Sequence, residues 1–386
     1  MEPKKSFSTI SIHGTGRRDK PYKAVVDPIV QNTTFLLDDI TDLEGITASK
    51  GYVYSRVGNP TQAALEERIR LLEGGESALA FASGMAAISS TLITLLKKRD
   101  HIISDEVIYG CTRDLFEGLS AKMGIEIDYI DLSDPSNLRD AIKESTRLVF
   151  FETPANPTMK LIDIKAIANI AKSHGLRVVV DNTFATPFIQ RPLELGADIV
   201  IHSATKYIGG HGDAIGGVLV ADQELARRVR STSLKDFGGC ISPFNAWLLI
   251  RGLKTLGVRM LVHDRNANKV AHFLEDEKEV ESVIYPYLSS HPQHKLAKRQ
   301  MTCGGGMIAF YMKSEAAVKK LLGNVRLCSP AVSLGSVETL IEHPYSMTHA
   351  NYPKKEQIGI NKRLVRISVG LEDPEDIITD LKEALE

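Results

Sequence analysis

A lysine close to two hydroxyl-bearing residues is the feature of this sequence best suited to covalent chemistry. Lys206 follows the apolar run at residues 199–201, with Ser203 and Thr205 before it and a glycine cluster behind it. An apolar run that breaks abruptly into polar residues predicts a short buried strand ending here. Ligands of open α/β sheets bind beyond the strand ends, where a lysine amine can form an imine with a carbonyl compound. The alternative is a solvated loop lysine, the common environment of this residue type.

Polar residues follow the other apolar runs as well. Each lies within or one to two positions after the end of such a run: Ser83, Asp105, Glu152, Asp181 and Ser203. The carboxyl ends of parallel strands line one edge of a sheet, so these groups are expected to meet in one crevice.

Predicted strands and helices, which must position these polar residues, alternate along the chain. Predicted strands cover residues 77–82, 101–104, 125–130, 147–151, 176–180, 199–201 and 217–220. Predicted helices begin at Asn59-Pro60 and cover 85–97, 112–122 and 164–172. Continuous Val/Ile/Leu strands separated by amphipathic helices predict an α/β fold, a mostly parallel seven-stranded sheet between helices.

The length of 386 residues predicts more than one domain. Residues 1–50 lack periodicity and suggest an extended N-terminal arm that needs a surface to pack on. Residues 51–245 hold the predicted sheet. A long helical pattern from residue 247 to 261 leads into a smaller C-terminal α/β domain, 246–386, with strands at 307–311 and 365–369 and helices at 315–322 and 373–385.

Composition excludes several functions. A formal net charge of -1 gives no electrostatic basis for binding nucleic acid or an anionic membrane. The four cysteines form no C-x-x-C pair, so no metal site or disulfide scaffold is expected and a reducing cytoplasm fits best. No apolar run approaches the ~18 residues of a membrane span. Gly14-Thr-Gly16 follows no strand and lacks a third glycine, which argues against a nicotinamide-dependent dehydrogenase.

Pyridoxal 5'-phosphate (PLP) is a carbonyl cofactor whose phosphate these segments could bind. Ser83-Gly84-Met85 opens a predicted helix, and helix N-termini bind phosphate through backbone N–H groups. Ser203 and Thr205 would add hydroxyl donors. A tight strand-to-helix turn is the alternative explanation for Gly84.

The ring of PLP makes further demands. A carboxylate keeps the ring nitrogen protonated, and Asp181 at the end of a strand is placed for that role. Asn156 could reach the ring oxygen, and Tyr109 could stack on the ring and transfer protons. Arg366, in an alternating segment, offers the fork that binds an α-carboxylate. Each residue also has a purely structural alternative. Asp181 could be a helix or turn cap, Asn156 a turn residue, Tyr109 a packing residue and Arg366 part of a surface salt bridge.

Several segments in one order resemble the Cys/Met-metabolism family of PLP-dependent enzymes, which has the aminotransferase-like fold type I. The resemblance runs nearly end to end. The segments are residues 54–61, 83–85, 152–157, 180–184, 203–206, 346–349 and 366–373.

The resemblance implies a role for each candidate residue. Lys206 carries PLP, Asp181 pairs with the ring nitrogen and Tyr109 stacks on the ring. The implied phosphate ligands are Gly84, Met85, Ser203 and Thr205. Ser333 and Arg366 match the residues that bind the substrate carboxylate. Tyr54 and Arg56 match residues given to the phosphate site of the neighbouring subunit, so a homotetramer of two active dimers is expected.

Two positions distinguish members of the family. Cys111 resembles the members that cleave methionine, whereas synthases place glycine there, and we treat it as a candidate catalytic residue. Members that act on cystathionine resemble one another in having Glu at the position of Val332, where a carboxylate would face the distal ammonium. An apolar Val suits a thioether methyl and would leave a charged tail unpaired. Trp247 looks more like the synthases.

The reaction implied is γ-elimination of L-methionine, and of relatives such as homocysteine, to a thiol, 2-oxobutanoate and ammonia. Lys206 would move protons at Cα and Cβ while Tyr109 protonates the departing sulfur. Cleavage or synthesis of cystathionine and sulfhydrylation of O-acetylhomoserine are alternatives within the family. A non-catalytic interaction protein on the same fold is the alternative outside enzymology.

Overall fold

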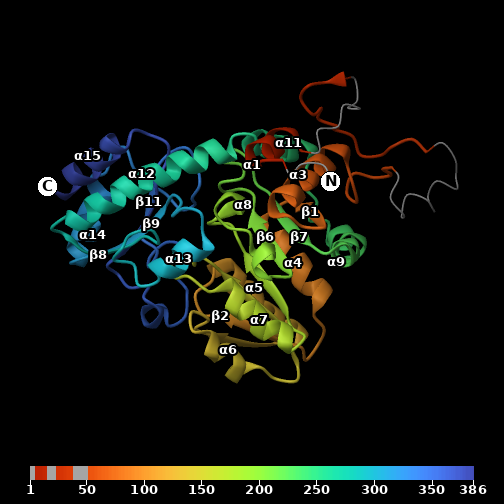
Figure 1. Cartoon of the computed structure of the whole chain (residues 1–386), viewed down its shortest axis with the longest axis horizontal. Helices are drawn as coiled ribbons and strands as arrows, with labels where there is room; N and C mark the ends of the chain where they lie inside the picture. The colour runs from red at the N-terminus through yellow and green to blue at the C-terminus, as the bar shows by residue number, and fades with distance from the viewer. Residues whose placement is uncertain (1–4, 15–22, 38–50) are drawn as a thin grey trace.

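Two β-sheets organise the chain. A computed structural model describes residues 5–14, 23–37 and 51–386. The larger sheet lies within residues 77–221 and the smaller within 280–368. The blue C-terminal elements pack beside the larger unit, and α12 (Leu256–Asp276) runs between the two (Figure 1). No helix in this described part of the chain is long and apolar enough to cross a membrane.

The larger sheet confirms the predicted seven strands. Their order is β1-β7-β6-β5-β4-β2-β3, and only β7 runs antiparallel to its neighbours. The strands are β1 (Ser77–Phe81), β2 (His101–Asp105), β3 (Glu126–Ile130), β4 (Thr146–Glu152), β5 (Arg177–Asp181), β6 (Ile199–Ser203) and β7 (Gly217–Ala221). The predicted mostly parallel arrangement is therefore correct.

Apolar side chains fill both faces of this sheet. On β4 and β5, Phe150 and Val179 enter one apolar cluster, whereas Val149 and Val178 enter the cluster on the opposite face. All four are 1% exposed or less. Burial on both faces explains why these strands read as continuous apolar runs instead of alternating ones.

Helices cover the two faces. They are α3 (Pro60–Glu73), α4 (Gly84–Leu95), α5 (Gly110–Met123), α6 (Pro135–Ala141), α7 (Ile164–Ser173), α8 (Thr186–Ile189) and α9 (Gln223–Val229), with a π-helical turn (Arg230–Leu234) joining α9 to α10 (Lys235–Phe237). The start of α3 follows its sequence signals: the Asn59 side chain accepts the amide of Thr61, Pro60 takes the first turn, and the helix ends at Gly74 in the left-handed region.

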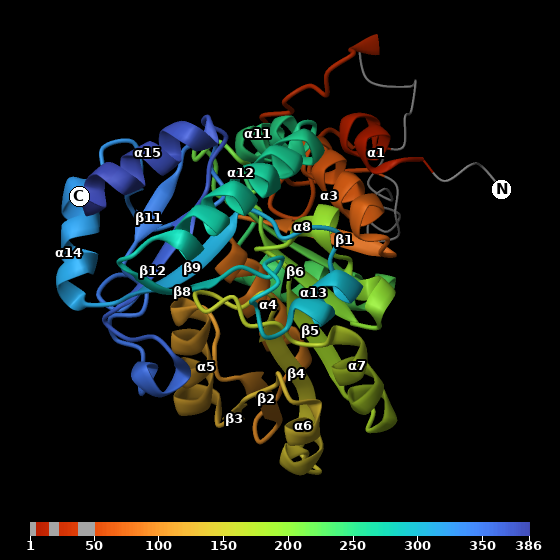
Figure 2. The same cartoon turned by 60° about the vertical axis from the view of Figure 1, so that its left-hand side comes forward.

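The smaller sheet has five strands in the order β10-β11-β12-β9-β8. They are β8 (Val280–Ile284), β9 (Met307–Met312), β10 (Ser329–Pro330), β11 (Leu340–Glu342) and β12 (Leu364–Ser368). Against it lie α14 (Glu315–Asn324) and α15 (Pro374–Leu385), with α12 along one side (Figure 2). The short helix α13 (His294–Gln300) lies toward the large sheet, where the Gln300 side chain bonds the backbone of Ile162 and Ile164. Sequence patterns predicted β9, β12, α14 and α15, but β10 and β11 are too short to show periodicity.

Two predictions need correction, one of a single long helix and one of an extended N-terminal arm. The single helix expected through residues 247–261 is two, α11 (Pro243–Leu253) and α12, separated at Lys254 and Thr255. The carbonyl of Gly252 accepts from the amide of Thr255 and from the Arg259 guanidinium, which fixes this break. The N-terminal arm is not wholly extended, because α1 (Phe7–His13) packs against α3 and α12.

Candidate active site

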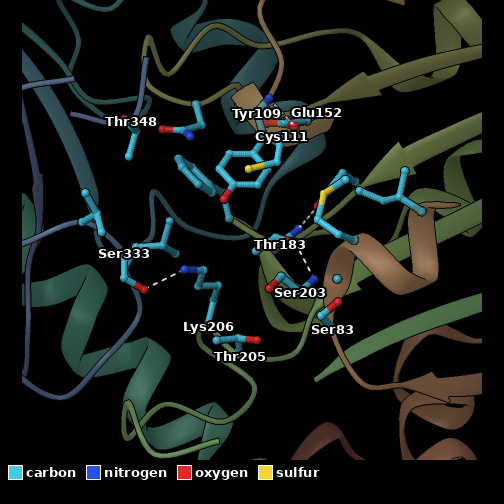
Figure 3. Close-up of a pocket in the computed structure, with 18 of the residues that line it drawn as sticks. Ser83, Tyr109, Cys111, Glu152, Thr183, Ser203, Thr205, Lys206, Ser333 and Thr348 are labelled. Atoms are coloured by element: carbon cyan, nitrogen blue, oxygen red, sulfur yellow. Dashed lines mark hydrogen bonds between the residues drawn. The ribbon is translucent and has the colours of Figure 1, made fainter. Parts of the chain in front are cut away.

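One cavity of about 490 Å³ opens at the carboxyl end of the large sheet, facing the small sheet. Figure 3 shows Ser333 and Thr348 on one side, Ser83 and Ser203 on the other, and Lys206 between them. The predicted site residues that line it are Ser83, Gly84, Met85, Tyr109, Cys111, Asn156, Asp181, Ser203, Thr205, Lys206, Val332, Ser333 and Arg366. Distant segments are thus gathered at the predicted edge.

Lys206 lies in the turn after β6 with its side chain largely buried. Its Nζ donates to Ser333 Oγ at 2.6 Å, a bond drawn in Figure 3. Burial, reinforced by the Arg366 guanidinium, lowers the pKa of Lys206 to about 8, while Glu342 acts in the opposite direction. Desolvation of a cation favours its neutral form, so roughly a tenth of this amine is unprotonated and nucleophilic at pH 7.

The start of α4 forms an anion cradle. Ser83 caps the helix through its Oγ, which accepts the amide of Ala86. A Cβ at Gly84 would lie 2.9 Å from the Cβ of Ser203, so glycine lets the helix N-terminus approach the end of β6. Thr205 Oγ1 lies 3.2 Å from the Gly216 carbonyl on the same side. Backbone N–H groups and hydroxyls of this kind suit a phosphate.

Two carboxylates, Glu152 buried and Asp181 partly buried, stand side by side at the sheet edge. Glu152 and Asp181 are register partners on β4 and β5. Burial raises the pKa of both; for Glu152 the charge of Asp181 adds to this, whereas Thr183 donates to Asp181 and opposes it. Within the described residues neither carboxylate forms an ion pair with Lys or Arg. A protonated pyridine nitrogen facing Asp181 would supply the missing positive charge, so this edge fits PLP.

Tyr109 stands at the start of α5 with its ring facing the cavity (Figure 3). Its backbone N–H donates to Glu152 Oε1 at 2.7 Å, which holds the start of α5 against the end of β4. Burial, followed by the adjacent Cys111 thiol, raises the pKa of the Tyr109 hydroxyl. The phenol therefore keeps its proton at neutral pH and can donate it. Cys111 is exposed and lines the same cavity.

Arg366 presents its guanidinium from the small sheet. Nη1 donates to Asn156 Oδ1 at 2.7 Å, and Nη2 donates to the Ser333 carbonyl at 2.6 Å. Glu342 Oε1 lies 3.1 Å from Nη1. Ser333 itself has a φ of 109°, a strained backbone for a residue other than glycine. Arg366 thereby holds Asn156 and Ser333 in one polar network.

Sequence reasoning did not assign roles to several residues of this site. Thr183 donates to the Asp181 carboxylate and its Oγ1 accepts the Ser203 amide at 2.8 Å. Thr348 and Glu342 complete the surroundings of Arg366. The position of Thr183 two residues after Asp181 was an available signal for an Asx-type turn. Thr348 and Glu342 lie in segments without periodicity.

Tyr54 and Arg56 do not line the cavity of their own chain. Tyr54 is 47% exposed, and the Arg56 guanidinium lies 5.6 Å from the centre of its ring. Their predicted place in a neighbouring subunit's site stays a prediction.

The fold and the site together define a fold type I PLP-dependent enzyme. Residues 8–386 match the family described as Cys/Met metabolism PLP-dependent enzyme. The chain belongs to this family, and its cofactor is PLP.

Several characterised proteins are similar over their full length. The chain is 48% identical to an L-methionine gamma-lyase of Fusobacterium nucleatum subsp. polymorphum, covering 100% of both chains. It is also 48% identical to a cystathionine beta-lyase of Lactococcus lactis subsp. cremoris, with 99% of each chain covered. Among solved structures, metB from Corynebacterium glutamicum superposes with a TM-score of 0.94 at 42% identity, covering 99% of this chain and 98% of that one.

Proposed function

We propose that this protein is a carbon–sulfur lyase that performs γ-elimination on L-methionine, and on related thioether or thiol amino acids such as homocysteine. The observation that carries the proposal is the lining of the cavity away from the cradle. Val332 and Ile215 reach it with exposed apolar side chains, and the Cys111 thiol joins them. Among the described lining residues the acids are Glu152 and Asp181, both at strand ends of the large sheet. An apolar thioether methyl suits this lining, whereas the distal ammonium of cystathionine would lack a carboxylate partner.

The similar proteins support the class of reaction, whereas the choice of substrate has to be argued from individual residues. Both L-methionine gamma-lyase and cystathionine beta-lyase occur at 48% identity. Identity therefore does not separate the two activities. Val332 and Cys111 are the residues on which the choice of methionine depends.

Residues of the large sheet would hold the cofactor. The start of α4 would hold its phosphate, Asp181 would pair with its ring nitrogen, and Lys206 would bond its aldehyde carbon. The proposed cofactor ligands are Tyr54 and Arg56 of a neighbouring subunit, Ser83, Gly84, Met85, Tyr109, Asn156, Asp181, Ser203, Thr205 and Lys206. When bound, PLP accepts the electron pair that remains when a proton leaves the substrate Cα.

The chain's own residues perform the remaining steps. Arg366 and Ser333 bind the substrate carboxylate and thereby fix which Cα bond faces Lys206. Lys206, whose lowered pKa of about 8 makes a neutral amine accessible, takes the proton from Cα and later removes one from Cβ. Tyr109 retains its proton until the thiol departs and delivers it to the sulfur. With one water consumed to release the keto acid, the products from methionine are methanethiol, 2-oxobutanoate and ammonia.

The proposed assembly is a homotetramer of two active dimers in the cytoplasm. Tyr54 and Arg56 lie outside their own cavity, as a contribution to a neighbour requires. Large apolar side chains also stay exposed on α11 and α12, with Phe244, Val258 and Leu261 all more than half exposed. An exposed apolar surface of this kind is typical of a subunit interface.

The test is a side-by-side assay of methionine, homocysteine, cystathionine and O-acetylhomoserine with the purified holoenzyme. We expect methionine or homocysteine to give the highest kcat/KM, with 2-oxobutanoate as product. A preference of more than about tenfold for cystathionine, equivalent to about 1.4 kcal/mol in the transition state, would contradict the proposed substrate. Pyruvate from cystathionine would indicate β-elimination instead.

A further inference from the structure

Glu342 is a buried acid that the proposed reaction does not use. It ends β11 and lies directly opposite Arg366 on β12 in the antiparallel register. Its side chain is 1% exposed and that of Arg366 is 3% exposed. Glu342 Oε1 lies 3.1 Å from Arg366 Nη1 and also accepts from Thr348 Oγ1 at 3.0 Å.

The two side chains are incompletely satisfied. Within the described residues, Glu342 Oε2 and Arg366 Nε are buried without a hydrogen-bond partner. A buried carboxylate with an unpartnered oxygen depends strongly on its ion pair, here with Arg366, because desolvation is costly for any ion. Burial raises the pKa of Glu342, and the Arg366 guanidinium is the largest influence that lowers it, followed by Thr348 and then the Lys206 ammonium.

A carboxylate ligand on Arg366 would disturb this balance. This step rests on the proposed role of Arg366. The guanidinium would then share its charge between the ligand and Glu342, which already occupies Nη1. Two carboxylates around one cation in a buried site cannot both stay fully ionised at low cost. Glu342, buried deeper than the ligand and holding a free oxygen, is the one placed to bind the proton.

We propose that Glu342 is a positioning residue for Arg366 that takes up a proton from solvent when a carboxylate ligand binds the guanidinium. In the free enzyme the Glu342 carboxylate holds the Arg366 guanidinium in the orientation that also bonds Asn156. In the complex the protonated Glu342 is neutral. It still accepts a hydrogen bond from Arg366 but no longer competes with the ligand for the positive charge. Affinity for carboxylates is thereby coupled to pH through a residue that never contacts the ligand.

Other charged or titratable groups also surround Glu342. The charged or titratable neighbours are Arg366 on β12, Lys206 after β6, Tyr109 at the start of α5 and His349 beside Thr348. Burial lowers the pKa of His349 to about 4, so this imidazole stays neutral at neutral pH. Burial raises the pKa of Tyr109, which keeps its proton. In the holoenzyme the Lys206 nitrogen is bonded to the cofactor and its protonation would change the visible absorbance, which separates it from Glu342, the acid directly opposite the guanidinium.

The sign of the effect follows from linkage. Binding raises the proton affinity of Glu342, so the complex holds more protons than the free enzyme. The dissociation constant of a carboxylate therefore increases as pH rises, by up to about tenfold per pH unit between the two titration points of Glu342. Above the higher of the two points the increase stops.

Propionate is a suitable probe, because it has a carboxylate and no amine that could react with the cofactor. Its binding to the holoenzyme is measured by titration calorimetry near neutral pH in two buffers of different ionisation enthalpy. We expect wild type to take up a substantial fraction of one proton. Glu342→Gln, which keeps an acceptor for Arg366 and Thr348, should take up none, bind propionate about tenfold more tightly and lose the pH dependence. Glu315→Gln, an exposed acid paired with Lys362, is the matched control and should behave as wild type.

The outcomes separate the possibilities. Propionate binding without proton uptake in wild type overturns the inference, even if Glu342→Gln fails to fold. Proton uptake that persists in Glu342→Gln assigns the proton to another group and also overturns it. Propionate that binds Arg366→Ala as tightly as wild type contradicts the proposed role of Arg366, and with it the inference, whereas the substrate assay above tests the reaction independently.

Discussion

The two halves of the cavity are built in different ways. On the large-sheet side, Asp181 ends a strand of one mostly parallel sheet, Ser83 and Lys206 closely follow strands of it, and their positions come from the backbone of that sheet. On the small-sheet side, Arg366 owes its position to contacts outside its own strand, chiefly with the side chains of Asn156, which follows β4, and Glu342, across the strand pair. The rigid half suits cofactor chemistry that many substrates share. The side-chain network suits recognition of the substrate, because substitution of a single residue can change which substrate is bound.

The largest effect is expected on the rigid side, from Lys206→Ala. Loss of the amine removes the group that moves protons at Cα and Cβ, and proton transfer by a positioned side chain contributes about 10²–10⁴-fold to a rate. We expect kcat for methionine to fall about a thousandfold or more. Lys235→Ala, an exposed lysine on α10, should retain full activity in the same assay. A Lys206→Ala enzyme within tenfold of wild type would remove lysine from the mechanism.

The buried amine should also be visible in the stability of the cofactor-free protein. The pKa of Lys206 is lowered to about 8 from 10.5, so the unfolded chain binds the proton more tightly than the folded one. The resulting penalty is fully present below pH 8 and disappears as pH rises to 10.5. Lys206→Met lacks it, so its stability advantage over wild type should shrink by about 3 kcal/mol across this window. Urea unfolding of both proteins at the two ends measures the change, and a constant difference would contradict the burial of the charge.

Asp181→Asn should lower kcat about 10- to 100-fold with little effect on KM. The amide cannot supply the charge that keeps the ring nitrogen protonated, and a hydrogen bond to a charged group is worth about 1.5–3 kcal/mol. Steady-state kinetics and the visible absorbance of the bound cofactor measure the two consequences. An unchanged kcat would mean that Glu152 or another group fills this role. Asp198→Asn, at a surface ion pair with Arg177, is the control.

On the recognition side, Arg366→Lys should raise KM about tenfold while kcat changes little. A lysine keeps the charge but cannot bond Asn156, Ser333 and a carboxylate at once. The pattern is the reverse of that expected for Asp181→Asn. If the two variants instead changed kcat and KM alike, the division of the cavity into a chemical half and a recognition half would be wrong.

The smallest effect is expected from Val332→Glu. A new carboxylate at this exposed position could pair with the distal ammonium of cystathionine, and exposed ion pairs contribute about 0.2–1 kcal/mol. The ratio of kcat/KM for cystathionine to that for methionine should therefore rise about two- to fivefold. Val332→Gln supplies the same size without the charge and serves as the control. A ratio that falls would show that another residue sets the preference.

The same contrast explains what could be predicted from the sequence. Asp181 and Ser203 were assigned because an apolar strand ends at each, and the parallel sheet then brings them together without further information. Glu342 was not assigned, because β11 has three residues and the pairing with β12 brings it beside Arg366 from 24 positions away. The break between α11 and α12 was also missed, since it depends on the Arg259 guanidinium bonding the Gly252 carbonyl. Local patterns predict strand ends, whereas contacts between side chains of different elements require the fold.

The most direct test of the account is the identity of the residue that bonds the cofactor. The holoenzyme is reduced with borohydride, digested and mapped by mass spectrometry. We predict one pyridoxyl label per chain, on Lys206 in the peptide that follows β6. A label on any other lysine, or no label in an enzyme that still turns over methionine, would contradict the central claim.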